Sequence, residues 1–135
     1  MLQKLLLTML LAAGACSSTT DNGNSSLSVK GTWSYSGMQT APAVSIAGVI
    51  SIDQQTGSSF SGSAQLRETD AQGTIRDVVG QVNGRVIAAD AVDFDIFIQA
   101  TTRRHVARVA ADSMGGTWAV TGTTTTGSFT ARRLP

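Results

Sequence analysis

Few side chains of this sequence could do acid–base or metal chemistry. His105 is the single histidine and Cys16 the single cysteine, so neither a histidine cluster nor a cysteine-based metal site can form. A nucleophilic site would have to use His105 as its base, and no G-x-S-x-G motif accompanies it. Arg103 and Arg104 precede it, and nearby positive charge disfavours its protonation. We interpret His105 as a histidine at the surface or at the mouth of a barrel.

Asp93 and Asp95 are the second candidate for chemistry. Two carboxylates spaced in this way on a strand share a face, and such pairs can serve glycoside hydrolysis or bind a hard cation. Their face lies opposite Phe94 and the other apolar residues of 91–99, so it should point to solvent, where arginines of 103–108 could form cross-strand ion pairs. The sequence therefore predicts no catalytic residue, no metal site and no cofactor, and we expect a protein that is not an enzyme.

Cys16 follows a leader with the three parts of a secretory signal. Residues 1–4 carry a positive charge, residues 5–13 are apolar apart from Thr8, and Ala13-Gly14-Ala15 supplies small residues before the cysteine. The apolar run is shorter than the roughly 20 residues that a membrane-spanning helix needs. These features predict a signal helix over residues 1–15 that is cleaved before Cys16.

The segment Ala13-Gly14-Ala15-Cys16 resembles the lipobox of bacterial lipoproteins, in which the cysteine receives diacylglycerol before cleavage. The resemblance implies palmitate-type acylation at Cys16 and a membrane anchor, and Ser17 resembles lipoproteins sent to the outer membrane. The family usually has Leu at position 13, and the segment also satisfies the ordinary A-x-A rule, so cleavage without lipidation stays open. Residues 16–27 are polar and predict a flexible tether.

Residues 28–135 have the size of one domain. Ten lysines and arginines stand against nine aspartates and glutamates in the whole chain, for a formal net charge of +1. This balance argues against nucleic acid as a partner, because that binding depends on an excess of cations that neutralise phosphates. The resemblance of the leader to that of a lipoprotein implies the cell envelope, most simply the outer membrane, as the location, and the side of the membrane that the domain faces stays open.

Short alternating runs of polar and apolar residues predict an all-β domain. Asp53–Gly57, Asp70–Gly73, Asn83-Gly84 and Asp112–Gly115 have the composition of turns, and Asn83-Gly84 is the strongest hairpin signal. Such short connections imply antiparallel neighbours. We predict eight main strands, with Arg85–Ala88 as a further short strand or a continuation. They lie near 29–36, 44–52, 58–67, 74–82, 91–99, 104–110, 116–121 and 127–133.

One face of nearly every predicted strand places a tiny residue two positions from a bulky one. Gly62 follows Phe60, Gly116 precedes Trp118, and a glycine at 127 precedes Phe129 in this way. Small barrels fill a tapering interior with this alternation. The pattern predicts a single closed, antiparallel up-and-down β-barrel of about eight strands over residues 28–135.

Two motifs carry a family resemblance. Met114-Gly115-Gly116-Thr117-Trp118, followed by residues 127–132, resembles the C-terminal signature of small bacterial secreted barrels and lipoproteins of lipocalin-like form. Gly31-Thr32-Trp33 is similar to the opening strand of avidin-like barrels, so the resemblance implies a calycin-type barrel. Such proteins share an architecture rather than one known activity. Biotin binding is not implied, because no Asn follows Gly31-Thr32-Trp33. The recurrence of Gly-Thr-Trp predicts that the two motifs lie near one another.

Six aromatic side chains on the inward face are the candidate ligand pocket, and eight-stranded barrels either fill with side chains or hold one small ligand. These residues are Trp33, Tyr35, Phe60, Phe94, Trp118 and Phe129. We predict a lipid-anchored, non-enzymatic barrel of the cell envelope that binds a small apolar ligand or serves as a structural module. The alternative is a protein-interaction scaffold with a filled barrel and no ligand. The sequence identifies neither the ligand nor a protein partner.

Overall fold

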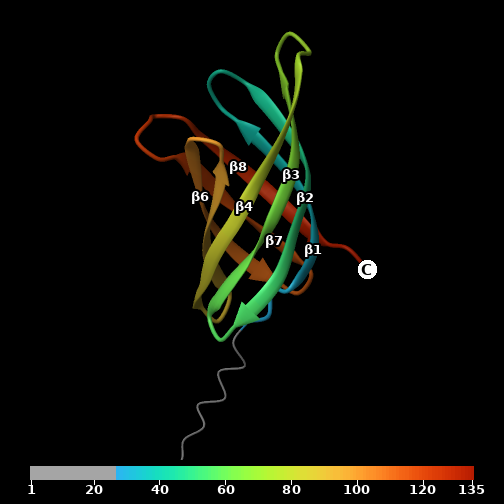
Figure 1. Ribbon diagram of the computed structural model, residues 1–135, viewed down its shortest axis with the longest axis vertical. Coiled ribbons are helices and arrows are strands. Elements are labelled where there is room, and N and C mark those ends of the chain that lie inside the picture. The colour runs from blue at the N-terminus through green and yellow to red at the C-terminus, as the bar shows by residue number, and fades with distance from the viewer. Residues whose placement is uncertain (1–26) are drawn as a thin grey trace, which may run out of the picture.

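The computed structural model describes residues 27–135, and this part of the chain is a closed antiparallel β-barrel (Figure 1). Each strand pairs with the next, and β1 pairs with β8 to close the barrel. The described residues form no helix that could cross a membrane. The predicted signal helix, Cys16 and nearly all of the predicted tether lie outside the described residues. The strands are β1 (Gly31–Gln39), β2 (Val44–Thr56), β3 (Ser59–Asp70), β4 (Ile75–Ala88), β5 (Ala91–Ile98), β6 (Thr101–Ala110), β7 (Ser113–Val120) and β8 (Thr126–Arg133).

The predicted all-β class and the eight-stranded up-and-down barrel are confirmed. The inward alternation explains the closure, because glycine allows neighbouring backbones to approach closely where the sheet curls. A Cβ atom at Gly62 would lie 1.8 Å from the carbonyl oxygen of Ser51, and one at Gly116 would lie 1.9 Å from that of Val106. At these two glycines, on β3 and β7, the backbones of the neighbouring strands β2 and β6 leave no room for a side chain.

The hairpin predicted at Asn83-Gly84 is wrong, because β4 continues through both residues to Ala88. Gly84 pairs with Phe60 on β3 and with Phe94 on β5. A Cβ atom there would lie 2.4 Å from the Phe60 ring and 2.5 Å from Cβ of Phe94. The glycine makes room for two aromatic side chains, and its sequence signature is the same as that of a turn. The expected continuation at Arg85–Ala88 is confirmed as the end of β4.

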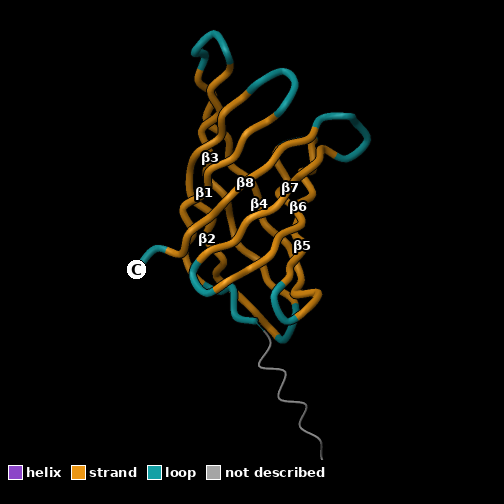
Figure 2. Tube along the Cα trace, turned by 180° about the vertical axis from the view of Figure 1, so that it is seen from behind, coloured by secondary structure: helices purple, strands orange, loops and turns teal. Residues whose placement is uncertain are grey.

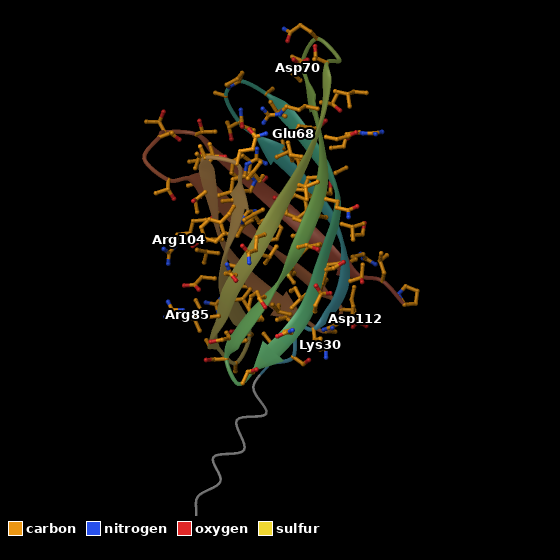
Figure 3. The ribbon with its side chains drawn as sticks, viewed as in Figure 1. Lys30, Glu68, Asp70, Arg85, Arg104 and Asp112 are labelled. Atoms are coloured by element: carbon orange, nitrogen blue, oxygen red, sulfur yellow. The ribbon has the colours of Figure 1, made fainter. Side chains whose placement is uncertain are left out.

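The two ends of the barrel differ in their connections (Figure 2). At one end, called the closed end here, lie residues 27–30 and the turns at 57–58, 89–90 and 111–112. At the other, called the loop end, lie the connections at 40–43, 71–74, 99–100 and 121–125. Figure 3 shows Lys30 and Asp112 at the closed end, with Glu68 and Asp70 at the loop end.

Candidate functional site

The closed end is covered by the residues that precede β1. Val29 is fully buried and belongs to the hydrophobic core, and Leu27 packs against that core. The indole Nε1 of Trp33 donates a hydrogen bond to the carbonyl oxygen of Val29 at 2.9 Å. The side chain of Gln55 accepts from the N–H of Val29 at 2.9 Å and donates to the carbonyl oxygen of Leu27 at 2.8 Å. Apolar burial and paired backbone groups together close this end.

Arg133 completes the closed end. Its guanidinium lies over the Trp33 ring, 4.5 Å from the ring centroid. Its Nε donates to the Asp112 carboxylate at 3.1 Å, its Nη2 donates to the carbonyl oxygen of Ser28 at 3.0 Å, and its Nη1 donates to the carbonyl oxygen of Lys30. All three nitrogens are therefore paired, and the contact joins the end of β8 to the start of the barrel.

The six aromatic residues of the predicted pocket all lie in the interior and are all buried. Tyr35 stacks on Phe129 with ring centroids 5.2 Å apart, and the ring centroids of Phe60 and Phe94 are 6.3 Å apart. The cavity that Trp33, Phe60 and Phe94 help to line has a volume of about 10 Å³. That is at the lower limit for a single water molecule. An organic ligand at this level of the barrel would have to displace side chains.

The prediction that His105 lies at the surface or at a mouth is wrong, because its side chain is fully buried among the interior rings. It stacks on Phe94 with centroids 4.5 Å apart. Its Nδ1 donates to the carbonyl oxygen of Arg103 at 3.0 Å, so its Nε2 is the unprotonated nitrogen and accepts from the Tyr35 hydroxyl at 3.1 Å. Burial lowers the pKa of His105 from 6.5 to about 3. The ring is neutral and enclosed, and its hydrogen-bond partners in residues 27–135 include no carboxylate.

Burial also affects Tyr35. It raises the pKa of the Tyr35 phenol well above 10, so the hydroxyl stays protonated and donates to His105. Two neutral, mutually hydrogen-bonded side chains of this kind are a satisfied polar pair within an aromatic core. The arrangement positions no group for acid–base chemistry near pH 7.

Asp93 lies on the outer face, as predicted, in ion pairs with Arg104 at 3.5 Å and Arg85 at 3.6 Å. Asp95 also belongs to the outward phase of β5. The described residues contain no group of three or more His, Cys, Asp or Glu side chains that could hold a metal ion. Arg103 departs from the expectation, because it points into the barrel rather than toward the aspartates.

Arg103, Glu68 and Arg76 form an ion cluster at the loop end, brought together from β6, β3 and β4. Nη2 of Arg103 donates to both carboxylate oxygens of Glu68 at 3.0 Å, and Nη2 of Arg76 donates to Oε1 at 3.0 Å. The side chains of Arg103 and Glu68 are 7% and 9% exposed, whereas that of Arg76 is 67% exposed. Figure 3 shows Glu68 near the loop connections. Sequence reasoning did not find this cluster.

The Arg103 guanidinium is incompletely hydrogen-bonded. Its Nε and Nη1 are buried and have no hydrogen-bond partner among the described residues, and its Cζ lies 5.2 Å from the centroid of the Trp118 ring. Toward the loop end, the inward positions of Gln39, Val44 and Val120 are only half-buried. We call Arg103, Glu68, Arg76 and the Trp118 ring the loop-end site. It could bind a group that accepts hydrogen bonds or carries negative charge.

Comparisons with known proteins support the fold. No protein-family model matches the chain, and no curated protein sequence matches it. Several solved barrels do. The redesigned β-barrel mFAP1, bound to DFHBI, is 13% identical with a TM-score of 0.65, covering 77% of this chain and 94% of its own. A related barrel, mFAP2b, also bound to DFHBI, is 14% identical with a TM-score of 0.64, covering 78% and 93%. A de novo designed fluorescence-activating barrel is 16% identical with a TM-score of 0.60, covering 78% and 93%.

These likenesses show that the chain has the fold of these designed β-barrels, two of which are bound to DFHBI. At this level of identity they show the fold alone. They do not place the chain in the calycin family.

Proposed function

We propose that this protein is a non-enzymatic, small-ligand-binding barrel of the cell envelope, a calycin-type lipoprotein anchored to the outer membrane through Cys16. The loop-end site takes the ligand. The likeness to barrels that bind DFHBI supports a binding role for this architecture. The sequence of the leader supports the anchor.

The observation that carries the proposal is the pair of unpartnered nitrogens on Arg103. Leaving a buried donor without an acceptor costs about 1–3 kcal/mol, and more for a charged group. Buried polar groups without partners are uncommon in native proteins, and a binding function is one explanation for them. Arg133 at the closed end shows that this fold can satisfy a whole guanidinium. The incomplete pairing of Arg103 therefore favours a partner from outside the chain.

The position of the first described residues supports an orientation. Leu27 and Val29 are held by hydrogen bonds with Gln55 and Trp33 at the closed end. In Figure 1 the described chain begins at this end, opposite to the loop connections. A lipid on Cys16 would therefore connect through the chain to the closed end. The loop end would then face away from the membrane and be open to diffusing ligands.

The test is native mass spectrometry of the full chain, produced in a bacterium and extracted with detergent. We expect a protein that begins at Cys16, carries acyl chains on that residue and retains a small molecule. The matched control is Cys16→Ser, which should lose the acyl chains and keep the small molecule. An unmodified Cys16 would refute the anchor. A bare barrel that no small molecule stabilises against heat would refute the binding role.

A filled scaffold is the second candidate function, and the interior volume favours it. With only about 10 Å³ left beside the inner aromatic rings, the barrel core is complete without a ligand. Val79 and Ile75 on β4 are 69% and 58% exposed, and such side chains are available for protein contacts. A bare barrel in the mass spectrum would support this alternative.

A further inference from the structure

We infer that the ligand of the loop-end site is a small carboxylate attached to an apolar group, and that it pairs with the guanidinium of Arg103. This inference rests on the proposed function, that a small ligand binds at this end, and it adds the chemical class of the ligand. Three features of the site lead to it: its charge, the unused nitrogens of Arg103, and the apolar residues around them.

The charge of the loop-end site is unbalanced. Arg103 and Arg76 share the single carboxylate of Glu68, which leaves one positive charge in excess. The nearest buried titratable groups, Tyr35 and His105, are both neutral. Asp70 lies further along β3, and its carboxylate accepts from the backbone N–H groups of residues 72 and 74 within the β3–β4 turn. A ligand with one negative charge would balance the site.

The geometry of Arg103 favours a carboxylate in particular. A guanidinium binds a carboxylate best through two parallel N–H groups on neighbouring nitrogens. Glu68 uses only Nη2, which donates to both of its oxygens, so each two-nitrogen edge of Arg103 keeps a free donor on Nε or Nη1. A carboxylate that displaced Glu68 from Nη2 could form the two-pronged pair. Glu68 would keep its hydrogen bond from Arg76, whose exposed side chain can move with it.

Apolar side chains also lie at the loop end of the barrel interior. The Trp118 ring lies against its guanidinium, and the inward positions at the same end include buried Ile46 and Ile98 and half-buried Val44. An inorganic anion would leave these side chains without a new contact. A carboxylate with a hydrocarbon or aromatic body would use both parts of the site, because burial of its apolar surface adds to the ion pair.

The experiment measures the affinity of three probes that share one ring and differ in charge: benzoate, benzamide and benzamidine. Quenching of Trp118 fluorescence reports binding, because Trp118 lies against Arg103 and Trp33 lies toward the opposite end. Isothermal titration confirms each constant. Hexanoate tests an aliphatic body. We expect benzoate or hexanoate to bind at least about tenfold more tightly than benzamide, and benzamidine to bind most weakly.

Variants assign the effect to the site. Arg103→Met should reduce carboxylate binding to the level of benzamide, and Arg103→Lys, which keeps the charge and loses the planar fork, should reduce it by a smaller factor. Glu68→Gln should increase carboxylate affinity severalfold, because the competing carboxylate is gone. The matched control is Arg67→Met, which removes an exposed arginine paired with Asp77 on the outer wall and should change nothing.

The outcomes separate this inference from the proposed function. If neither benzoate nor hexanoate binds more tightly than benzamide, or if Arg103→Met and Arg103→Lys leave carboxylate binding unchanged, the inference is refuted while a small-ligand role stands. If no probe binds, the molecule retained in the native mass spectrum decides, since an acid supports the inference and a neutral or cationic molecule refutes it. A bare barrel that no small molecule stabilises against heat would refute both.

Discussion

Each end of the barrel pairs an arginine with a tryptophan, and the two pairs differ in their hydrogen bonds. Arg133 lies over Trp33 and donates hydrogen bonds from all three guanidinium nitrogens. Its side chain is 25% exposed, so water could also accept hydrogen bonds from it. Arg103 lies beside Trp118, is 7% exposed, and uses one nitrogen. The arginine with less access to water thus has fewer partners. The closed end has the features of a structural contact, whereas the loop end keeps two buried donors without a partner among the described residues.

Both tryptophans belong to a Gly-Thr-Trp motif, and the expectation that the motifs lie near one another is wrong. Strand β8 separates β1 from β7. Trp33 is the third residue of β1, near the closed end, whereas Trp118 is the sixth of the eight residues of β7, near the loop end. Strands β1 and β7 run in the same direction, each antiparallel to β8. The motif comes early in β1 and late in β7, so the two tryptophans lie at opposite ends of the barrel. Their different neighbours then decide what each arginine does.

The largest expected effect is at the closed end. Trp33→Ala removes a fully buried indole, its hydrogen bond to Val29 and its contact with Arg133. We expect the free energy of unfolding in urea to fall by about 4 kcal/mol, as for other large-to-small changes in a core. Phe97→Ala, which truncates a ring that is 39% exposed on β5, is the control and should cost much less. A loss for Trp33→Ala no greater than for the control would show that the closed end does not stabilise the fold.

Arg133→Met should have the next largest effect. It leaves the carbonyl oxygens of Ser28 and Lys30 without their donor and removes the stacking on Trp33. We expect a loss of about 2 kcal/mol, because partly exposed carbonyl groups recover some hydrogen bonding from water. Thermal and urea unfolding measure it. The neighbouring Arg132→Met, on the exposed side of β8, should be nearly neutral, and equal losses for the two variants would contradict a specific role for Arg133.

The sequence predicts the architecture well because most strands have one clearly apolar phase. Strand β5 shows it: Val92, Phe94, Ile96 and Ile98 are buried as expected. Strand β6 has no such phase. Its inward residues are Arg103, His105, Ala107 and Val109, and its outward residues are Arg104, Val106, Arg108 and Ala110. Both sets mix charged and apolar side chains, so the alternation alone does not show which set faces the interior. Closure of the barrel decides, and it turns His105 inward and leaves Val106 50% exposed.

The loop-end site was missed for a related reason. Glu68 continues the inward phase of Phe60, Ala64 and Leu66 on β3, and this is the signal that the sequence does contain. A carboxylate at an inward position predicts a buried cation nearby, because a buried charge without a partner is costly. Its partner Arg103, however, is 35 residues away, on a strand whose inward phase the sequence leaves undecided. The contact depends on which residues of β3 and β6 reach the same level of the closed barrel.

Acid should weaken the fold through the histidine next to the loop-end site. Above pH 6.5 His105 is neutral in the folded and unfolded states and contributes no pH dependence. Between pH 6.5 and the folded-state pKa of about 3, the unfolded chain binds a proton that the folded chain does not, so stability falls as the pH falls. The slope is about 1.4 kcal/mol per pH unit, or about 2 kcal/mol between pH 6.5 and 5, where few carboxylates titrate.

Urea unfolding of the wild type and of His105→Phe measures this dependence. The variant should be less stable at pH 7, because the Tyr35 hydroxyl and the carbonyl oxygen of Arg103 lose their partner. Its stability should change little between pH 6.5 and 5. A variant that keeps the wild-type slope would assign the acid sensitivity to another group.

The smallest expected effect, that of a double variant at the loop end, distinguishes the two ends most directly. Arg103→Met alone leaves Glu68 buried with only Arg76 as a partner, and we expect a loss of about 2 kcal/mol, less than is usual for a broken buried pair because one ion pair remains. The double variant Glu68→Met/Arg103→Met removes both buried charges and the unpaired nitrogens. Replacing a buried ion pair by apolar residues of similar size is often neutral or stabilising. We therefore expect the double variant to lie within about 1 kcal/mol of the wild type in urea unfolding, while losing its preference for carboxylates. If the double variant lost as much stability as Arg133→Met, the ion cluster would be a structural contact like the one at the closed end.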